Sequence, residues 1–173
     1  MAQVRIGERA VGEGAAPLVV AELSANHNGS LARAEEVLRA VAEAGAEAVK
    51  FQTYTADTIT LDSDSEEFRI GSGPWAGRRL WDLYDEAHTP WEWHERLFGL
   101  ARELGLIAFS TPFDATALEF LEGFDPPVYK IASFEAVDLP LIERVAATGK
   151  PLIISTGMAD LEEIGEAVEA AGG

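Results

Sequence analysis

The sequence contains no cysteine, so it can form neither a disulfide bridge nor a thiolate metal site. No apolar run approaches the ~18 residues that a membrane-spanning helix needs. The amino-terminal segment also has no apolar core of the kind that marks a signal peptide. These absences predict a soluble, cytoplasmic protein that does not contact membranes.

Positive charge is scarce as well. The chain has 13 Lys and Arg residues against 30 Asp and Glu residues, which gives a formal net charge of −17. Binding to a phosphate backbone needs an excess of cations on one face, so nucleic acid is excluded as a partner. A small anionic ligand remains compatible with this charge, because one or two cations in a cleft outweigh a distant, screened acidic surface.

Several motifs that bind nucleotides or metals are missing. The sequence has no GxGxxG before a helix, no P-loop and no HExxH. Its three histidines, His27, His88 and His94, do not have the spacing of metal ligands. No metal site is therefore assigned within these 173 residues.

What the sequence does contain is an alternation of strand and helix patterns. Short apolar runs rich in β-branched residues alternate with Ala-, Glu- and Leu-rich stretches of helical period, which is typical of βαβ units and a parallel sheet. We predict five strands, at residues 17–23, 46–53, 106–111, 127–132 and 151–156. The 173 residues and their 47% apolar content suffice for one packed domain.

Signals for helix ends separate these units. Thr89 followed by Pro90 and Glu92 predicts a capped helix start, and Asp160 with Glu163 predicts another. Gly45, Gly105 and Gly149 each stand where a helix should stop before the next strand. Residues 3–13 are compatible with a small hairpin under the sheet.

Residues 54–88 are too long for an ordinary loop between a strand and a helix, and segments of that length are usually functional lids or insertions. All four tryptophans lie in or near this segment. We expect most of them to pack the insertion rather than to stack on a sugar.

The strand pattern predicts an α/β fold, specifically a TIM-type (β/α)8 barrel of which this chain supplies about the first five βα units. Residues 1–173 would then be the N-terminal portion of a barrel catalytic domain. The alternative is an open, doubly wound sheet of five strands. We favour the barrel because polar residues gather at the ends of all five strands, whereas an open sheet concentrates its site at one switch point.

Lysine is the most informative residue type, because only three of the 13 cationic residues are lysines. Lys50 and Lys130 lie inside predicted strands, where an uncompensated charge is costly to bury. Either they bind an anionic ligand at the mouth of the barrel, or they form buried ion pairs with Glu22 or Glu135. Lys150, at the start of a strand, is expected to be a solvated surface residue.

Further polar residues follow the strands. Glu22 ends the first strand, and Asn26, a predicted substrate-binding residue, and His27 come after it. A histidine at this position either pins the loop or acts in catalysis. Gln52 shares a strand face with Lys50. Hydroxyl groups of Thr111, Ser133 and Ser155 end the later strands and suit phosphate oxygens, whereas Asp114 is better explained as a helix cap.

Six strings carry a resemblance to a known family. In chain order they are AELSANHNGS, VKFQTYT, LWDLYDEAHTPWEWH, FSTPFD, YKIASFE and GKPLIISTGM. This combination, from about residue 17 to about residue 165, resembles the sialic acid synthase family and is most similar to its pseudaminic acid synthase branch. The TPWEWH string after the insertion and the SANHNGS turn favour that branch.

The resemblance implies a metal-dependent condensation of phosphoenolpyruvate with the aldehyde of an N-acetylated amino sugar, giving a nonulosonic acid and phosphate. It implies that one group of residues binds phosphoenolpyruvate, namely Lys50, Thr111, Lys130, Ser133 and Ser155. Glu22, Gln52 and Glu135 are implied to lie near the sugar or the reacting carbons. Glu22 and Glu135 are the candidate catalytic residues, and either carboxylate could position or deprotonate the water that adds to C2. It also implies a divalent Mn or Mg ion and a homodimer.

In the family pattern the metal-binding histidines and a small C-terminal antifreeze-like domain lie beyond residue 173. We therefore expect this segment alone to be inactive. Three alternatives remain open. They are a Schiff-base aldolase with Lys130 as the nucleophile, a related synthase for a phosphorylated sugar, and a non-catalytic half-barrel that binds or assembles through open sheet edges.

Overall fold

The computed structural model describes residues 3–173. Each predicted strand is present within its predicted range or one residue beyond it. The five strands are β3 (Val20–Glu22), β4 (Ala48–Thr53), β5 (Ile107–Pro112), β6 (Tyr129–Ile131) and β7 (Leu152–Ile154). All of their pairings are parallel, which confirms the α/β class.

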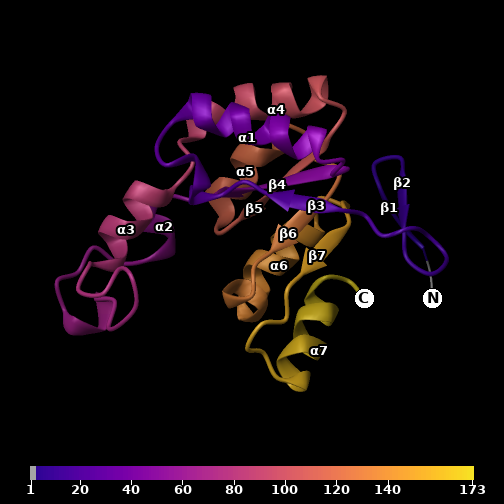
Figure 1. Cartoon of the computed structure of the whole chain (residues 1–173). Coiled ribbons are helices and arrows are strands. Elements are labelled where there is room, and N and C mark those ends of the chain that lie inside the picture. Colours follow the sequence, from indigo (N-terminus) through magenta and orange to yellow (C-terminus); the bar gives the residue numbers. More distant parts are fainter. Residues whose placement is uncertain (1–2) are drawn as a thin grey trace.

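The parallel strands follow one another in space in the order in which they occur in the chain. β3, β4 and β5 form one hydrogen-bonded sheet, β6 and β7 form a second, and β5 lies against β6. Across residues 3–173 the order never reverses, as it does at the switch point of a doubly wound sheet. Figure 1 shows α1 and α4 over the first sheet, with α6 and α7 beside β6 and β7.

Helix bounds agree with most of the predicted caps. The long helices are α1 (Leu31–Glu43), α4 (His94–Glu103), α5 (Ala115–Glu122), α6 (Leu139–Ala146) and α7 (Leu161–Ala170). The predicted capping box of Asp160 and Glu163 opens α7, and Asp114 caps α5. Gly45, Gly105 and Gly149 end helices with positive φ, as predicted.

The capped start predicted at Thr89 is wrong. The segment forms a 3-10 turn, η3 (Trp91–Trp93), and α4 begins only at His94, without a side-chain cap at either start. The hydroxyl of Thr89 is used elsewhere, since its Oγ1 lies 3.3 Å from Nε2 of His27.

Alternating strand residues build two apolar layers. Val49, Phe51 and Ala108 join Tyr129 and Ile131 in the main core under the helices. On the opposite face, Ala48, Phe109 and Val128 form a smaller cluster with Ile6 of the amino-terminal segment. Helices thus cover one face of the sheet. On the other face the small cluster lies toward the amino ends of the strands, so polar residues can occupy only the part nearer to the carboxyl ends.

The predicted hairpin is present as β1 (Val4–Ile6) and β2 (Arg9–Val11), which pair antiparallel. Ile6 is 4% exposed and packs at the amino ends of the parallel strands. Nε of Arg9 forms an ion pair of 2.8 Å with Glu47, which directly precedes β4. The hairpin therefore closes the end of the sheet opposite to the strand carboxyl ends.

The insertion at residues 54–88 contains α2 (Ala56–Ile59), the short η2 (Glu66–Phe68) and α3 (Leu80–Ala87). Arg79 ties it together through ion pairs with Asp62 at 2.6 Å and Asp82 at 2.5 Å. In Figure 1 the insertion projects from the body on the left. No helix within residues 3–173 is long and apolar enough to cross a membrane.

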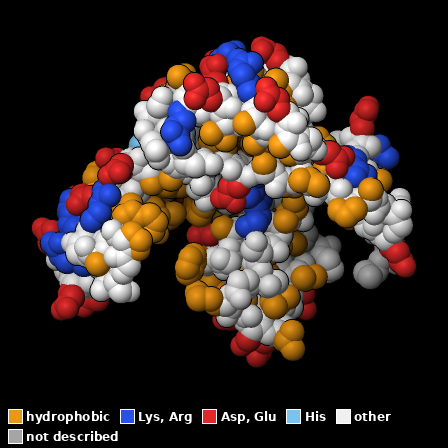
Figure 2. Space-filling view, in the orientation of Figure 1, with side chains coloured by type: hydrophobic (Ala, Val, Ile, Leu, Met, Phe, Trp, Pro, Cys, Tyr) orange, Lys and Arg blue, Asp and Glu red, His pale blue; other side chains and the backbone are white. Residues whose placement is uncertain are grey.

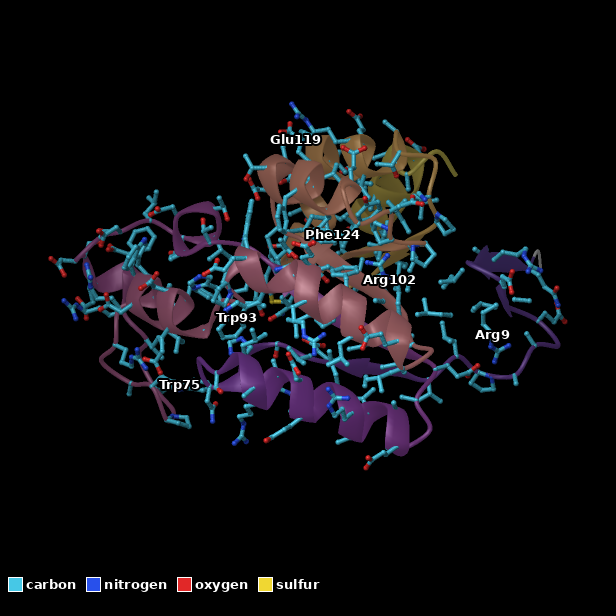
Figure 3. The ribbon with its side chains drawn as sticks, turned by 90° about the horizontal axis from the view of Figure 1, so that it is seen from above. Arg9, Trp75, Trp93, Arg102, Glu119 and Phe124 are labelled. Atoms are coloured by element: carbon cyan, nitrogen blue, oxygen red, sulfur yellow. The ribbon has the colours of Figure 1, made fainter. Side chains whose placement is uncertain are left out.

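The prediction that most tryptophans pack the insertion is wrong, because two of the four pack on other parts of the molecule. Trp91 stacks on Phe120 with ring centroids 4.7 Å apart, and the ring of Trp93 meets His27 edge-on. Nε1 of Trp81 donates to Asp57 at 2.8 Å, within the insertion. Figure 3 shows α1 and α4 side by side, with Trp93 near one end of α4 and Arg102 near the other. Trp75 is 53% exposed.

Candidate functional site

The candidate site begins on the strand face that points away from the helices. Glu22 of β3 stands opposite Lys50 of β4 in the parallel register. Their side chains form an ion pair of 2.9 Å between Oε2 and Nζ, with Lys50 14% exposed and Glu22 48% exposed. The ion-pair alternative predicted for this lysine is therefore present, at the exposed edge of the site rather than deep inside it.

Lys130 lies two strands further along, on β6, opposite Ile153 of β7. Burial, followed by the nearby charge of Lys50, lowers the pKa of Lys130, although Glu22 and Glu135 act in the opposite direction. Among residues 3–173 no carboxylate forms an ion pair with it. Lys130 is thus a half-buried amine without a fixed counter-ion.

A second row of polar residues stands closer to the carboxyl ends. Gln52 of β4 lies opposite Thr111 of β5, so both emerge at the same level. Thr111 is 1% exposed, and its Oγ1 is buried without any hydrogen-bond partner. An orphaned buried hydroxyl costs free energy unless a ligand or water completes it.

Glu135 is the second orphan. It lies on η4 (Phe134–Val137), the 3-10 turn that follows β6, and its Oε2 is buried without a partner. Burial, and after it the charge of Asp138, raises the pKa of Glu135, while Lys130 lowers it. The carboxyl group is therefore disposed to hold or exchange a proton nearer to neutral pH than an exposed glutamate.

Ser133 and Ser155 complete the predicted hydroxyl set. The backbone N–H of Ser155 donates to Ile131 at 3.1 Å, which fixes the end of β7 beside β6. Gly157, in the turn after β7, approaches Ser133 so closely that an added Cβ would lie 2.2 Å from the Ser133 Cβ. The last two strand ends are therefore held in direct contact.

A cavity of about 540 Å³ opens beside these groups. Gln52, Ser133 and Glu135 form its polar side. Its other side is mostly aromatic and apolar, lined by Tyr54, Ile59, Tyr84, Phe113 and Phe134. Figure 2 shows apolar side chains on both sides of the hollow between the insertion and the β6–α6 part of the molecule.

Sequence reasoning missed the contribution of the insertion to this wall. Ile59 of α2 and Tyr84 of α3 reach the cavity, and the ring of Tyr84 meets that of Tyr54 edge-on at 5.9 Å. The length of the insertion was the available signal, but no residue spacing connects position 84 with position 54. Only the fold brings the two rings together.

The loop after β3 is held mainly by its own contacts. Oδ1 of Asn26 accepts from the backbone N–H of Ser24 at 3.0 Å, so this predicted binding residue is engaged locally. His27 is fully buried, and its Nδ1 accepts from the backbone N–H of Gly29 at 3.1 Å. These contacts favour the loop-pinning role for His27.

The residues present do not form a metal site. Within residues 3–173, no three side chains of His, Cys, Asp or Glu gather in a way that could hold a metal ion. Glu22 is paired with Lys50, and Glu135 has the charge of Asp138 nearby, but neither carboxylate belongs to a group of three potential ligands. The family resemblance implies metal ligands beyond residue 173, so the divalent metal ion stays a prediction.

A model of the NeuB family matches residues 37–172. This chain belongs to the NeuB family. The NeuB-family chain is 52% identical over 152 residues to pseudaminic acid synthase of Helicobacter pylori, covering 88% of this chain and 45% of the relative. It is 50% identical over 146 residues to pseudaminic acid synthase of Campylobacter jejuni, covering 84% of this chain and 43% of the relative.

A solved structure of a named sialic acid synthetase is also similar to this chain. The NeuB-family chain superposes with a TM-score of 0.85 and 26% identity on N-acetylneuraminic acid (sialic acid) synthetase from Leptospira borgpetersenii, solved in complex with citrate. The match covers 99% of this chain and 55% of the other. The NeuB-family chain thus spans about half the length of the proteins it matches.

Proposed function

We propose that the protein to which this chain belongs condenses phosphoenolpyruvate with the aldehyde of an N-acetylated amino sugar, forming a nonulosonic acid of the pseudaminic type and releasing phosphate. The observation that carries the proposal is the arrangement around Lys130. A half-buried amine without a counter-ion lies within electrostatic reach of Glu135, whose Oε2 is orphaned, and the neighbouring strand β5 carries a second orphaned atom, Oγ1 of Thr111. The named synthases that the chain resembles support the same reaction.

The five parallel strands are proposed to be the first five of an eight-stranded (β/α)8 barrel. Chain-order strand neighbours and helices on one face support this architecture. In such a barrel the active site stands at the carboxyl ends of the strands. Gln52, Thr111 and Ser155 lie at or just after those ends, and the hairpin closes the opposite end.

The donor suits this polar set. Phosphoenolpyruvate carries up to about three negative charges near neutral pH, so it needs cations and hydroxyls that hold its phosphate and carboxylate. Lys50 and Lys130 supply the positive charge, and Thr111, Ser133 and Ser155 supply hydroxyl donors. The aromatic side of the cavity is proposed to receive the sugar, with Gln52 between the two ligands.

In the reaction, C3 of phosphoenolpyruvate attacks the aldehyde carbon, and C2 becomes cationic. Water then adds to C2, and the tetrahedral intermediate loses phosphate as the C2 carbonyl forms. Of the two protons of this water, one ends on the former aldehyde oxygen and the other leaves with phosphate. Glu135 is the proposed group that orients this water and accepts its proton, because its free Oε2 faces no other partner. Glu22, the ion-pair partner of Lys50, is proposed to be the second catalytic carboxylate. The divalent metal of the family would need ligands from outside residues 1–173, and no step here depends on it.

Replacing Lys130 tests the donor assignment. We expect Lys130→Met to weaken phosphoenolpyruvate binding by about 100-fold in calorimetry, since a hydrogen-bonded charge contact to a trianion is lost. Lys150→Met is the matched control, because Lys150 forms an ion pair with exposed Asp125 on the surface. Equal affinity of the two variants would exclude Lys130 from the donor site.

Two other functions have distinct signatures. A Schiff-base aldolase would trap pyruvate covalently on Lys130 in the presence of borohydride, and the lowered pKa of that lysine is compatible with this chemistry.

A non-catalytic half-barrel would bind no phosphoenolpyruvate and would associate through its sheet edges as concentration rises. A synthase for a phosphorylated acceptor would need further Lys or Arg at the mouth, and among residues 3–173 none lines this cavity.

A further inference from the structure

A chain of buried polar side chains lies behind the candidate site, on the helix side of the sheet. Thr53, His94 and Ser110 are each 0% exposed. Oγ1 of Thr53 lies 2.8 Å from Nε2 of His94 and 2.7 Å from Oγ of Ser110. Nδ1 of His94 lies 3.3 Å from the backbone oxygen of Pro90. Three separate segments of the chain thus meet in one hydrogen-bonded row.

The order of the protons in this row follows from elementary chemistry. A carbonyl oxygen can only accept a hydrogen bond, so Nδ1 of His94 must carry a proton and donate it in a hydrogen bond to the backbone oxygen of Pro90. Burial lowers the pKa of His94 to about 4, which keeps the ring neutral and leaves Nε2 as an acceptor. Thr53 must then donate to His94. Because that uses its only proton, Ser110 must donate to Thr53.

The row connects to the site through the strands themselves. Thr53 follows Gln52 on β4, and Ser110 precedes Thr111 on β5. Successive strand residues point to opposite faces, so fixing Thr53 and Ser110 behind the sheet fixes Gln52 and Thr111 in front of it. The last two are direct register partners.

The other end of the row holds the exit of the insertion. Pro90 comes two residues after the insertion ends, and the adjacent Trp91 donates from Nε1 to the backbone oxygen of Tyr54 at 3.2 Å. Tyr54 is the first residue of the insertion and lines the cavity. One network therefore holds both ends of the segment that supplies Ile59 and Tyr84 to the cavity wall.

We propose that Ser110, Thr53 and His94 form a positioning relay, a row of fixed hydrogen bonds in which no proton is transferred. Its proton order is the direction of donation: Ser110 donates to Thr53, Thr53 donates to His94, and His94 donates to the Pro90 carbonyl. The relay sets the spacing of Gln52 and Thr111 and fixes the insertion relative to them. None of the three residues touches the ligands. The functional part of this proposal rests on the proposed binding of phosphoenolpyruvate, whereas the proton order is independent of it.

The proton order is tested on the wild-type chain by ¹⁵N NMR of the histidine rings. We expect His94 to show a protonated Nδ1 and an unprotonated Nε2 at neutral pH, and to keep this neutral form well below pH 6. A ring that carries its proton on Nε2, or that becomes charged near pH 6.5, would overturn the relay. This measurement needs no variant and no ligand.

The positioning role is tested with a matched pair of substitutions. Thr53→Val keeps the shape and removes the hydroxyl, whereas Thr53→Ser keeps the hydroxyl. We expect Thr53→Val to raise the dissociation constant of phosphoenolpyruvate about tenfold, and Thr53→Ser to restore binding close to the wild-type value. Ser30→Ala removes the cap of α1, away from this row, and controls for loss of stability alone.

The outcomes separate the two proposals. If the wild-type chain binds phosphoenolpyruvate and Thr53→Val binds it equally well, the positioning role is wrong while the proposed donor stands. If Ser30→Ala weakens binding as much as Thr53→Val at matched loss of stability, the role is merely structural and the proposal fails. If the wild-type chain binds no phosphoenolpyruvate, the proposed function and the positioning role both fail. The proton order is then tested by the NMR measurement alone.

Discussion

At the scale of single residues, the two strand lysines and their candidate partners Glu22 and Glu135 were predictable, but which lysine would be paired was not. A lysine in the middle of an apolar strand must have a compensating group, which the sequence indicates by itself. Which lysine receives that group depends on register. The parallel pairing places Glu22 against Lys50, and within the described residues no carboxylate forms an ion pair with Lys130.

Glu135 should make stability depend on pH in a defined direction. Because the pKa of Glu135 is raised in the folded chain, its ionised form destabilises the fold above that pKa, and this cost disappears below the unfolded value of about 4.3. We expect Glu135→Gln to raise the melting temperature by a few degrees at pH 7 and hardly at all at pH 4. Calorimetry at the two pH values measures this difference.

Glu166→Gln on the exposed surface of α7 is the matched control for Glu135→Gln, and it should change the melting temperature little at either pH. A gain from Glu135→Gln that is equal at pH 4 and pH 7 would show that burial of the charge is not its cause.

Two glycines offer a matched test of the contact between the last strand ends. Gly157→Ala would place its Cβ 2.2 Å from the Ser133 Cβ, and we expect about 1–3 kcal/mol loss of stability together with weaker phosphoenolpyruvate binding. Gly165→Ala in α7 meets no atom within 4 Å and should stabilise the helix by about 0.5–1 kcal/mol. Urea unfolding and calorimetry compare the two; unchanged donor binding by Gly157→Ala would contradict the role of that turn.

At the scale of elements, local patterns predicted most of the fold. Strands, the hairpin and the Asp160 cap depend on period, turn residues and neighbours within four positions, and all are present. The predicted cap at Thr89 failed because its hydroxyl pairs with His27, 62 residues away. The row from Ser110 to His94 was missed for the same reason: Thr53 and His94 are 41 residues apart, and a lone histidine gives no indication of its partner.

The hairpin should contribute to stability mainly through one side chain. Ile6 is 4% exposed and packs on Ala48, Phe109 and Val128, so Ile6→Ala should lower the free energy of unfolding by about 2–4 kcal/mol. Val4→Ala, on the same strand but 49% exposed, should cost about 0.5 kcal/mol or less. Urea denaturation measures both, and equal losses would mean that the hairpin does not pack as a closing layer.

At the scale of the whole molecule, the sequence predicted the parallel strands and the helices between them, but the described residues do not form a complete site. Within residues 3–173, β3 and β7 each have one edge that pairs with no other strand. The chain spans 43% and 45% of the two pseudaminic acid synthases described above.

This incompleteness leads to a prediction about activity. We expect the isolated 173-residue chain to bind phosphoenolpyruvate but to release no phosphate when an N-acetylated amino sugar and a divalent metal are added, because no metal donor set exists in its described part. A phosphate-release assay measures this, with the full-length protein as the positive control. Acceptor-dependent phosphate release by the isolated chain would show that five βα units suffice.

The ion pair between Lys50 and Glu22 has a consequence for selectivity among solution anions. Since Glu22 already neutralises Lys50 at 2.9 Å, a ligand must compete with a tethered carboxylate before it gains that ammonium group. Chloride or acetate, with a single charge, offers no more than Glu22 does. We expect a multiply charged ligand that reaches Lys130 at the same time to bind in preference to monovalent anions, because it gains a second ammonium group.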